Sequence, residues 1–280
     1  MIETRDLTKN FDNFTAVDSL NLKIEKGEFF GLLGPNGAGK TTTISLLSTL
    51  LLPTKGEILI DGQQLTRKRP DLKRKISVIT QEYSMRQDMN MDEIMEYQGR
   101  LYFMPRKQIK ERTEELLEFC DLLKFRKRTV RKLSGGMKRK LMVCRALLTD
   151  PEILLLDEPT AGMDALSRRQ MWNLLRKLNE KNLTILLTTH YMEEAQSLCN
   201  RVALMDHGKL EEVSTPSALI ESLGAYAVDE MTADGTQNHY FHTRQEAIRY
   251  LEELTGQASL RETTLEDVFV ERAGKHLISK

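Results

Sequence analysis

The clearest candidates for chemistry in this sequence form the stretch GPNGAGKTT, which runs from Gly34 to Thr42. Its spacing fits G-x-x-x-x-G-K-[ST], with Gly34, Gly39, Lys40 and Thr41 at the defined positions. Glycines let backbone N–H groups approach a ligand closely. Lys40 can then reach the outer phosphates of a nucleoside triphosphate, and the Thr41 hydroxyl can complete the shell of a Mg²⁺ ion. The stretch therefore predicts a site for a nucleoside triphosphate.

The segments on either side of this stretch are those that such a site needs. Residues 29–33, FFGLL, form a short apolar run typical of a buried strand, and residues 42–47 can open a helix. A glycine-rich turn between a strand and a helix exposes successive N–H groups at the positive end of the helix, where anions bind. The order of strand, turn and helix therefore supports the phosphate site.

Polar residues also follow three other predicted strands. Asp157 and Glu158 follow the run ILLL, His190 ends the buried strand 183–189, and Gln81 follows ISVIT. In an open α/β sheet, residues that follow the strands at this end lie in the crevice where ligands bind. Asp157 is predicted to hold Mg²⁺ together with Thr41. Glu158 is predicted to accept a proton from the attacking water, and His190 to contact the γ-phosphate. For Gln81 two alternatives stay open, a ligand contact or a cap of the turn.

A second pair of adjacent glycines lies in the stretch LSGGM, at residues 133–137. Ser134 suits the N-cap of a helix predicted over about residues 138–148. Gly135 and Gly136 again expose backbone N–H groups at a helix N-terminus. The stretch is interpreted either as a second anion site or as a helix cap alone.

Two phenylalanines, Phe11 and Phe14, lie in the polar turn KNFDNFTA. An aromatic ring there can stack on a purine base, or it can anchor the loop by burying itself. The sequence favours neither alternative.

The composition argues against several classes of protein. Lys and Arg together number 41, as do Asp and Glu, so the formal net charge is zero and no nucleic-acid partner is expected. Three cysteines without CxxC spacing indicate neither a disulfide framework nor a zinc site, which favours a reducing cytosol. The charged N-terminus does not fit a signal peptide, and no apolar run approaches the ~18 residues of a membrane-spanning helix. We expect another chain to supply any membrane-spanning part.

The order of the predicted elements indicates the domain organisation. Helical periodicity dominates residues 90–130, with Pro105 separating two runs, which predicts an inserted helical subdomain. From about residue 218 the pattern loosens, and a small appended unit is predicted without a catalytic constellation. Its expected elements are short strands at 225–228 and 240–242, a helix at 244–254 and a last helical turn at 265–271.

Together, these motifs resemble those of the ATP-binding cassette (ABC) family over roughly residues 1–215. In this comparison GPNGAGKTT is the Walker A motif, Gln81 the Q-loop, LSGGM the signature and ILLLDE the Walker B motif with its glutamate. The D-loop corresponds to AGMD, which ends at Asp164, and the switch histidine corresponds to His190. A signature between a Q-loop and a Walker B strand separates this family from other P-loop ATPases.

The resemblance implies an α/β fold with a P-loop NTPase core. That core has a mixed or parallel sheet, an antiparallel β subdomain and a helical subdomain inserted at about residues 82–150. A small α+β appendage follows at the C-terminus. The cassette is expected over residues 1–217 and the accessory region over residues 218–280.

The resemblance also implies the cofactors and the roles of single residues. ATP and Mg²⁺ are expected, with Mg²⁺ held by Thr41, Gln81 and Asp157. Glu158, His190 and Gln81 form the implied catalytic set. Phe11 stands where the family often has tyrosine against the adenine. The remaining residues expected to bind the nucleotide are Gly34, Pro35, Asn36, Gly37, Ala38, Gly39, Lys40, Thr41 and Thr42, together with Ser134, Gly135, Gly136 and Asp164.

The implied assembly is a head-to-tail dimer of cassettes, in which the signature of one chain contacts the nucleotide of the other. An integral-membrane permease is expected to dock at Gln81 and residues 82–101. The stretches THYMEEAQSLCNRVALMDHGKL and TLEDVFVERAG are similar to those of drug-resistance and lipid or polysaccharide exporters. The implied function is to power such an exporter from the inner face of the cell membrane. A single-cassette ABC ATPase that assembles iron–sulfur clusters is the alternative.

Overall fold

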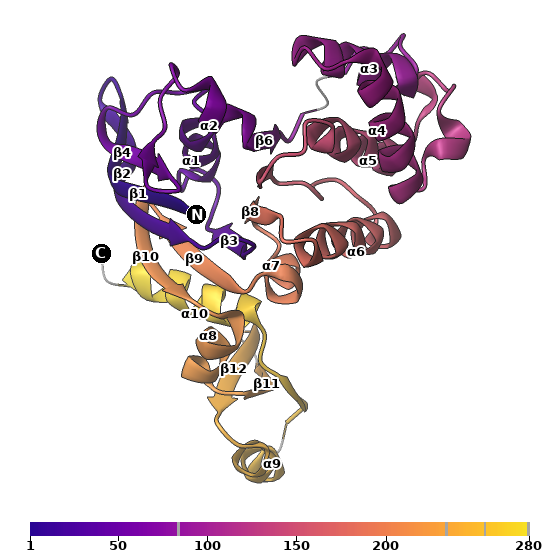
Figure 1. Cartoon of the computed structure of the whole chain (residues 1–280). Helices are drawn as coiled ribbons and strands as arrows, with labels where there is room; N and C mark the ends of the chain where they lie inside the picture. The colour runs from indigo at the N-terminus through magenta and orange to yellow at the C-terminus, as the bar shows by residue number, and fades with distance from the viewer. Residues whose placement is uncertain (83–84, 233–234, 255, 279–280) are drawn as a thin grey trace. The chain divides into compact units, whose positions relative to one another are not determined.

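The computed structural model describes residues 1–82, 85–232, 235–254 and 256–278, and the chain divides into two compact units (Figure 1). The first unit contains Met1–His190 and Ala203–Glu212, and the second contains Tyr191–Val202 and Val213–Lys280. Compactness thus places residues 191–202 with the C-terminal part of the chain, so it does not locate a boundary at one point in the sequence. The boundary between residues 217 and 218 stays a prediction.

The core of the first unit is a six-stranded sheet in the order β10-β9-β3-β8-β7-β6. Every residue of β3, β7 and β8 is buried, which explains why their sequences are continuous apolar runs rather than alternating ones. Two of its strands, β9 (Arg201–Asp206) and β10 (Lys209–Ser214), follow His190 in the chain. The four parallel strands are β3 (Phe29–Leu33), β8 (Thr184–Thr189), β7 (Ile153–Asp157) and β6 (Ile76–Ile79).

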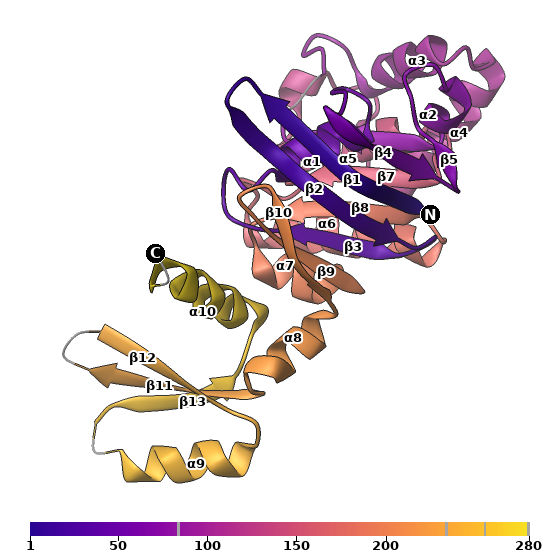
Figure 2. The same ribbon diagram turned by 90° about the vertical axis from the view of Figure 1, so that its left-hand side faces the viewer.

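A second sheet is antiparallel, in the order β2-β1-β4-β5, and Figure 2 shows the hairpin of β1 and β2 in front of the core sheet. Its strands β1 and β2 are long, with 10 and 11 residues. Register shifts beside Asp6 (φ 48) and Ser19 (φ 50) let the pairing continue past polar residues. The strands are β1 (Ile2–Phe11), β2 (Phe14–Ile24), β4 (Lys55–Ile60) and β5 (Gln63–Gln64).

The helical subdomain predicted between the sheet strands is present. Its helices α3 (Met91–Leu101), α4 (Arg106–Phe119) and α5 (Gly135–Leu147) pack on one another. Pro105 is the N-cap of α4, which explains the break between the two periodic runs. Among the helices of the described residues, none has the length and apolar character needed to cross a bilayer. The other helices of this unit are α1 (Lys40–Leu47), α2 (Pro70–Arg74), η1 (Leu123–Phe125), η2 (Val130–Lys132) and α6 (Ala165–Glu180).

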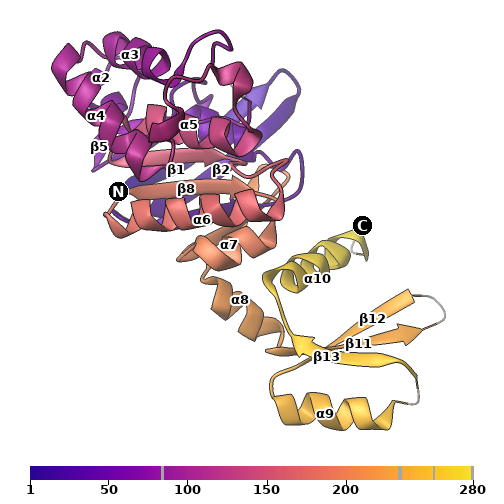
Figure 3. The same cartoon turned by 90° about the vertical axis from the view of Figure 1, so that its right-hand side faces the viewer.

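The second unit is an α+β structure, as predicted. Its sheet has the order β12-β11-β13, and Figure 3 shows α9 and α10 on opposite sides of it. The strand β13 was not predicted, and α10 is a helix of 14 residues instead of a single turn. The elements are α7 (Met192–Leu198), α8 (Pro216–Leu223), β11 (Tyr226–Thr232), β12 (Gly235–Phe241), α9 (Arg244–Glu253), β13 (Ala258–Glu262) and α10 (Leu265–Ile278).

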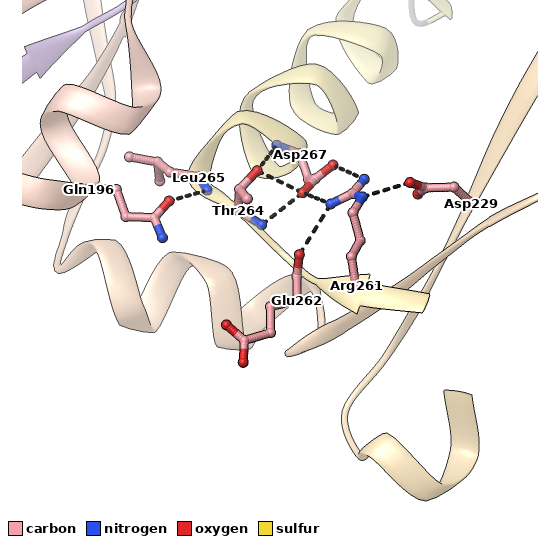
Figure 4. Close-up of polar contacts among 7 residues, drawn as sticks. All are labelled: Gln196, Asp229, Arg261, Glu262, Thr264, Leu265 and Asp267. Atoms are coloured by element: carbon pink, nitrogen blue, oxygen red, sulfur yellow. Dashed lines mark hydrogen bonds and ion pairs between the residues drawn. The ribbon is translucent and has the colours of Figure 1, made fainter. Parts of the chain in front are cut away.

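A cluster around Arg261 fixes α10 to this sheet (Figure 4). Arg261 of β13 donates to Asp229 of β11 at 2.7 Å and to both carboxylate oxygens of Asp267 at 2.7 and 2.8 Å. Thr264 and Asp267 cap the start of α10, since the Thr264 N–H donates to the Asp267 carboxylate at 2.7 Å and the Asp267 N–H donates to the Thr264 hydroxyl at 3.4 Å. Burial alone raises the pKa of Asp267, but hydrogen bonds from Arg261 and Thr264 outweigh burial and hold that pKa below its usual value.

Candidate active site

The parallel strands of the core sheet end side by side. Leu33 of β3 pairs with Thr189 of β8, and Asp157 of β7 pairs with Thr188 of β8. The residues that follow these strands therefore emerge at one edge of the sheet, where α/β proteins bind ligands. The structure brings the Walker A stretch, Asp157, Glu158 and His190 together there, as the strand pattern predicted. Their chemical roles stay predictions.

The glycine-rich loop leads directly into α1, which begins at Lys40, two residues earlier than predicted. Gly39 is its N-cap with φ 104, and a Cβ there would lie 2.3 Å from the Ala16 carbonyl oxygen. A Cβ on Gly34 would lie 2.1 Å from the carbonyl oxygen of Met205. Both positions therefore exclude larger residues. The first turn of α1 carries no acidic residue, which leaves the positive end of the helix available to an anion.

Lys40 is buried inside this loop, with only 5% of its surface exposed. Its Nζ donates to the carbonyl oxygens of Gly34 at 2.8 Å and Pro35 at 2.9 Å. Burial lowers the pKa of the amine, against a smaller opposite effect of the Glu158 and Asp157 charges. Within the described part of the chain, no carboxylate lies within ion-pair distance of Nζ. A buried ammonium in this setting fits a bound phosphate.

Oxygen atoms suited to Mg²⁺ meet next to the loop. The Thr41 hydroxyl donates to Asp157 Oδ1 at 3.2 Å, and the Thr188 hydroxyl donates to the same oxygen at 2.6 Å. Hydroxyl and carboxylate oxygens are ligands that Mg²⁺ prefers, and it takes its others from phosphates and water. The residues present therefore fit the ion. The side chain of Gln81 is exposed after β6, and in the described residues no hydrogen bond joins it to Thr41 or Asp157. Its place as a third ligand stays a prediction.

Glu158 follows Asp157 directly and has a left-handed backbone, with φ 47. Its side chain is 15% exposed, and its Oε1 lies 3.2 Å from Nδ1 of His190. The His190 side chain is 40% exposed, so this pair stands at the surface of the edge. A carboxylate beside an imidazole at the end of a core strand has the chemistry needed to take up and pass on a proton.

The predicted signature and D-loop residues cap two helices. Ser134 is the N-cap of α5 and accepts the Met137 N–H at 3.3 Å, while Asp164 is the N-cap of α6 and accepts the Ser167 N–H at 2.9 Å. Hydrogen bonds from Ser167 lower the pKa of Asp164. A Cβ on Gly136 would lie 3.2 Å from the Ser167 hydroxyl, so the two segments adjoin. The capping interpretation of Ser134 is confirmed, and the anion site at Gly135 and Gly136 stays a prediction.

Comparison with known proteins agrees with these features. Residues 17–161 match the family model of the ABC transporters, with the description "ABC transporter". The chain is also 35% identical to the Nod factor export ATP-binding protein I of Cupriavidus metallidurans, over 99% of this chain and 98% of that protein. This chain belongs to the ABC transporter family.

Further similarities extend this membership. The cassette is 35% identical to the linearmycin resistance ATP-binding protein LnrL of Bacillus subtilis, over 84% of this chain and 76% of that protein. It is 39% identical to the daunorubicin/doxorubicin resistance ATP-binding protein DrrA of Streptomyces peucetius, over 80% of this chain and 68% of that protein. Among solved structures, it is similar to a dimeric post-hydrolysis state of the cassette MJ0796 with ADP and Pi. That match has a TM-score of 0.68 at 28% identity and covers 77% of this chain and 98% of the other.

The two phenylalanines of the N-terminal hairpin remain at the surface of the cassette. Phe11 pairs with Phe14 across the turn, and their exposed fractions are 42% and 61%. Neither ring anchors the loop by burial, so that alternative is wrong. The Phe11 ring instead lies under the ammonium of Lys9, 5.0 Å from the ring centroid. Stacking of Phe11 on adenine stays a prediction.

Sequence reasoning missed two residues of this site, Thr188 and Arg139. Thr188 is fully buried at the end of β8 and contacts Asp157 through its hydroxyl. Arg139 is 1% exposed in α5 and donates to the carbonyl oxygens of Thr80 and Glu158. In the sequence, Thr188 could have been noticed as part of a threonine pair that ends an apolar strand. Arg139 could have been noticed as an arginine three residues before the apolar Met142. Each signal is weak without the neighbours that the fold provides.

Proposed function

We propose that this cassette is the ATP-hydrolysing subunit of an ABC exporter and that it works as one of a pair of cassettes. The observation that carries the proposal is the convergence at one sheet edge of a buried Lys40, the Thr41–Asp157 contact and the Glu158–His190 pair. These are the groups needed to hold a triphosphate and to activate a water molecule.

Each residue has a role that follows from its position. Lys40 and the N–H groups at the start of α1 bind the phosphates, since both present positive charge at the loop. Thr41 and Asp157 hold Mg²⁺, which neutralises the charge of the phosphates when bound. Glu158 accepts the proton of the attacking water, a form of catalysis typically worth ~10²–10⁴ in rate. His190, whose Nδ1 lies 3.2 Å from Oε1 of Glu158, orients that carboxylate and would contact the γ-phosphate of a bound nucleotide.

The names of the relatives support coupling to export. They are described as Nod factor export, linearmycin resistance and daunorubicin/doxorubicin resistance ATP-binding proteins. We infer that the partners are an integral-membrane permease and a second cassette, and that the chain is held at the inner face of the membrane by the permease. The dimeric solved cassettes support the pairing. In the pair, Ser134, Gly135, Gly136 and Asp164 contact the nucleotide of the other chain.

The test uses the variant Glu158→Gln, which keeps the shape of the side chain and removes its basicity. We expect at least a 100-fold loss of ATP hydrolysis together with an ATP-dependent dimer in light scattering, because nucleotide binding is retained while reopening is blocked. Glu57→Gln, at a half-buried position of β4 beside Arg5 and outside the candidate site, is the matched control and should hydrolyse ATP normally. Unchanged hydrolysis in Glu158→Gln would exclude the proposed base.

The same variant tests the export role. Trapped with ATP and Mg²⁺, it should recover a multi-helix membrane protein from detergent-solubilised membranes, and wild-type protein without ATP should recover less of it. Recovery of soluble iron–sulfur assembly proteins in its place would retain the ATPase activity and contradict export.

A further inference from the structure

One deeply buried charged side chain, Arg139, links three of the motifs described above. Arg139 lies one turn into α5, the helix that begins at Gly135 of the signature, and only 1% of its surface is exposed. Its Nη1 donates to the carbonyl oxygen of Thr80 at 2.8 Å, and its Nη2 donates to the carbonyl oxygen of Glu158 at 3.3 Å. Thr80 directly precedes Gln81. One guanidinium thus joins the signature helix to the Q-loop segment and to the candidate base.

Glu158 needs such support because of its backbone. Its φ of 47 lies in the left-handed region that residues with a side chain rarely adopt, and such conformations persist only where the surroundings hold them. On one side, its N–H donates to the carbonyl oxygen of Thr188 at 3.0 Å and to the Thr188 hydroxyl at 3.2 Å. On the other side, its carbonyl oxygen accepts from Ala161 N–H at 3.2 Å and from Arg139. The strained residue is held at both ends of its backbone.

The type of residue at position 139 fits this task. A guanidinium presents several donors in a rigid planar fork, so it can fix two carbonyl oxygens in one geometry. Burying it is unfavourable unless those donors are used, and an apolar side chain would pack into α5 without that penalty. A purely structural position between apolar neighbours such as Leu141 and Met142 would therefore favour an apolar residue.

We propose that Arg139 is a positioning residue for hydrolysis. It holds the backbone of Glu158 in the strained conformation that aims the carboxylate at its water, and it ties that conformation to the signature helix and the Q-loop segment. A displacement of α5 or of Thr80 then moves the base out of place. The inference rests on the proposed role of Glu158 as the base, and it adds the means by which two distant motifs control that base.

The decisive variants are Arg139→Met and Arg139→Lys in the full chain. Arg139→Met keeps length without donors, and Arg139→Lys keeps the charge without the planar fork. Loss of positioning of a catalytic group typically lowers the rate by ~10–100-fold. We expect kcat to fall by about that factor in Arg139→Met and by less in Arg139→Lys, while KM and the Kd for ATP change by less than about threefold.

A second readout separates positioning from simple destabilisation. In the Glu158→Gln background, Arg139→Met should cause no further loss of hydrolysis, because both changes act on the same base. That double variant should still dimerise with ATP. The control Leu147→Ala, at a buried position of the same helix, should lower the melting temperature and leave kcat unchanged.

Three results would overturn the inference. They are a kcat within twofold of wild type in folded Arg139→Met, additive losses in the double variant, and an equal loss of kcat in Leu147→Ala. Any of them, with Glu158→Gln inactive, would leave the proposed function intact. Normal hydrolysis in Glu158→Gln would instead remove the proposed base and the inference with it.

Discussion

Thr188→Val removes a single hydroxyl from the interior of the candidate active site. The Thr188 side chain is fully buried, and its hydroxyl donates to Asp157 Oδ1 at 2.6 Å. The Thr188 hydroxyl oxygen itself accepts the Glu158 N–H at 3.2 Å. Valine has nearly the same shape, so little empty space is created. The Glu158 N–H keeps its second acceptor, the Thr188 carbonyl oxygen, at 3.0 Å. The change is therefore confined largely to the orientation of the Asp157 carboxylate.

The magnitude follows from the kind of bond that is lost. A hydrogen bond to a charged group is worth about 1.5–3 kcal/mol, and residues that orient metal ligands change metal affinity by about 10–100-fold. The remaining contact to this carboxylate oxygen, from the Thr41 hydroxyl, is longer at 3.2 Å. We expect Thr188→Val to raise the free Mg²⁺ concentration for half-maximal hydrolysis by about 10-fold or more. Thr188→Ser keeps the hydroxyl and should stay close to wild type.

The assay measures ATP hydrolysis against free Mg²⁺ at a fixed, saturating ATP concentration. Thr184→Val is the matched control, because Thr184 lies in the same strand, is 1% exposed and accepts the Gly27 N–H at 2.9 Å. This control should lose stability by about as much as Thr188→Val and keep the wild-type Mg²⁺ dependence. If Thr188→Val hydrolyses ATP with an unchanged Mg²⁺ requirement, Asp157 does not depend on Thr188 for its orientation and the reasoning is refuted.

Two further predictions concern the loop and the second unit. Gly39→Ala should weaken ATP binding at least about 10-fold in a titration, because it adds left-handed strain at φ 104 and a Cβ 2.3 Å from the Ala16 carbonyl oxygen. The control Gly62→Ala is also strained, at φ 75, but its Cβ would have nothing within 4 Å, so it should bind ATP normally. Equal ATP binding by the two variants would contradict the steric argument. Arg261→Met should destabilise the second unit by about 2–3 kcal/mol at pH 7. This loss is smaller than that for breaking a fully buried ion pair, because the Arg261 side chain is 34% exposed. The pKa of Asp267 is lowered in the folded state, so the stabilisation is present above its unfolded pKa of 3.8 and is lost as the pH falls through the lower folded pKa. Hydrogen exchange of β13 should therefore differ between wild type and Arg261→Met at pH 7, and this difference should begin to shrink only below about pH 4. A difference independent of pH would exclude the ion pair as its cause.

The main features of the site could be predicted because they depend on local patterns. A buried parallel strand is apolar along its whole length, so the first polar residue after it marks the carboxyl edge of the sheet. This rule predicted that Asp157, after ILLL, and His190, after the strand 183–189, lie at the same edge of the sheet. The parallel register of β7 and β8 brings the ends of these two strands together. The glycine-rich loop was equally readable because its motif is local, although the contacts that exclude a Cβ at Gly34 and Gly39 come from the distant residues Met205 and Ala16.

The second unit was predicted less completely because its elements depend on contacts made outside them. The strand β13 is short and has no buried residue, so it has no hydrophobic alternation to reveal it. The start of α10 was readable as the sequence TLED, in which Thr264 and Asp267 cap the helix, but its length was not. Arg261, 32 residues after Asp229 in the chain, completes that cap from a neighbouring strand.

Thr188 and Arg139 escaped prediction for the same physical reason, which also explains why they matter. Thr188 in β8 contacts the Asp157 carboxylate, and Arg139 in α5 contacts the Glu158 carbonyl oxygen. These contacts exist only after the sheet and the helical subdomain have packed. The left-handed φ of Glu158 cannot be read from its own sequence, since glutamate has no preference for that region. A strained residue held by two partners from separate elements responds to the movement of either. The part of the site that sequence patterns do not encode is therefore the part best placed to make hydrolysis depend on the rest of the cassette.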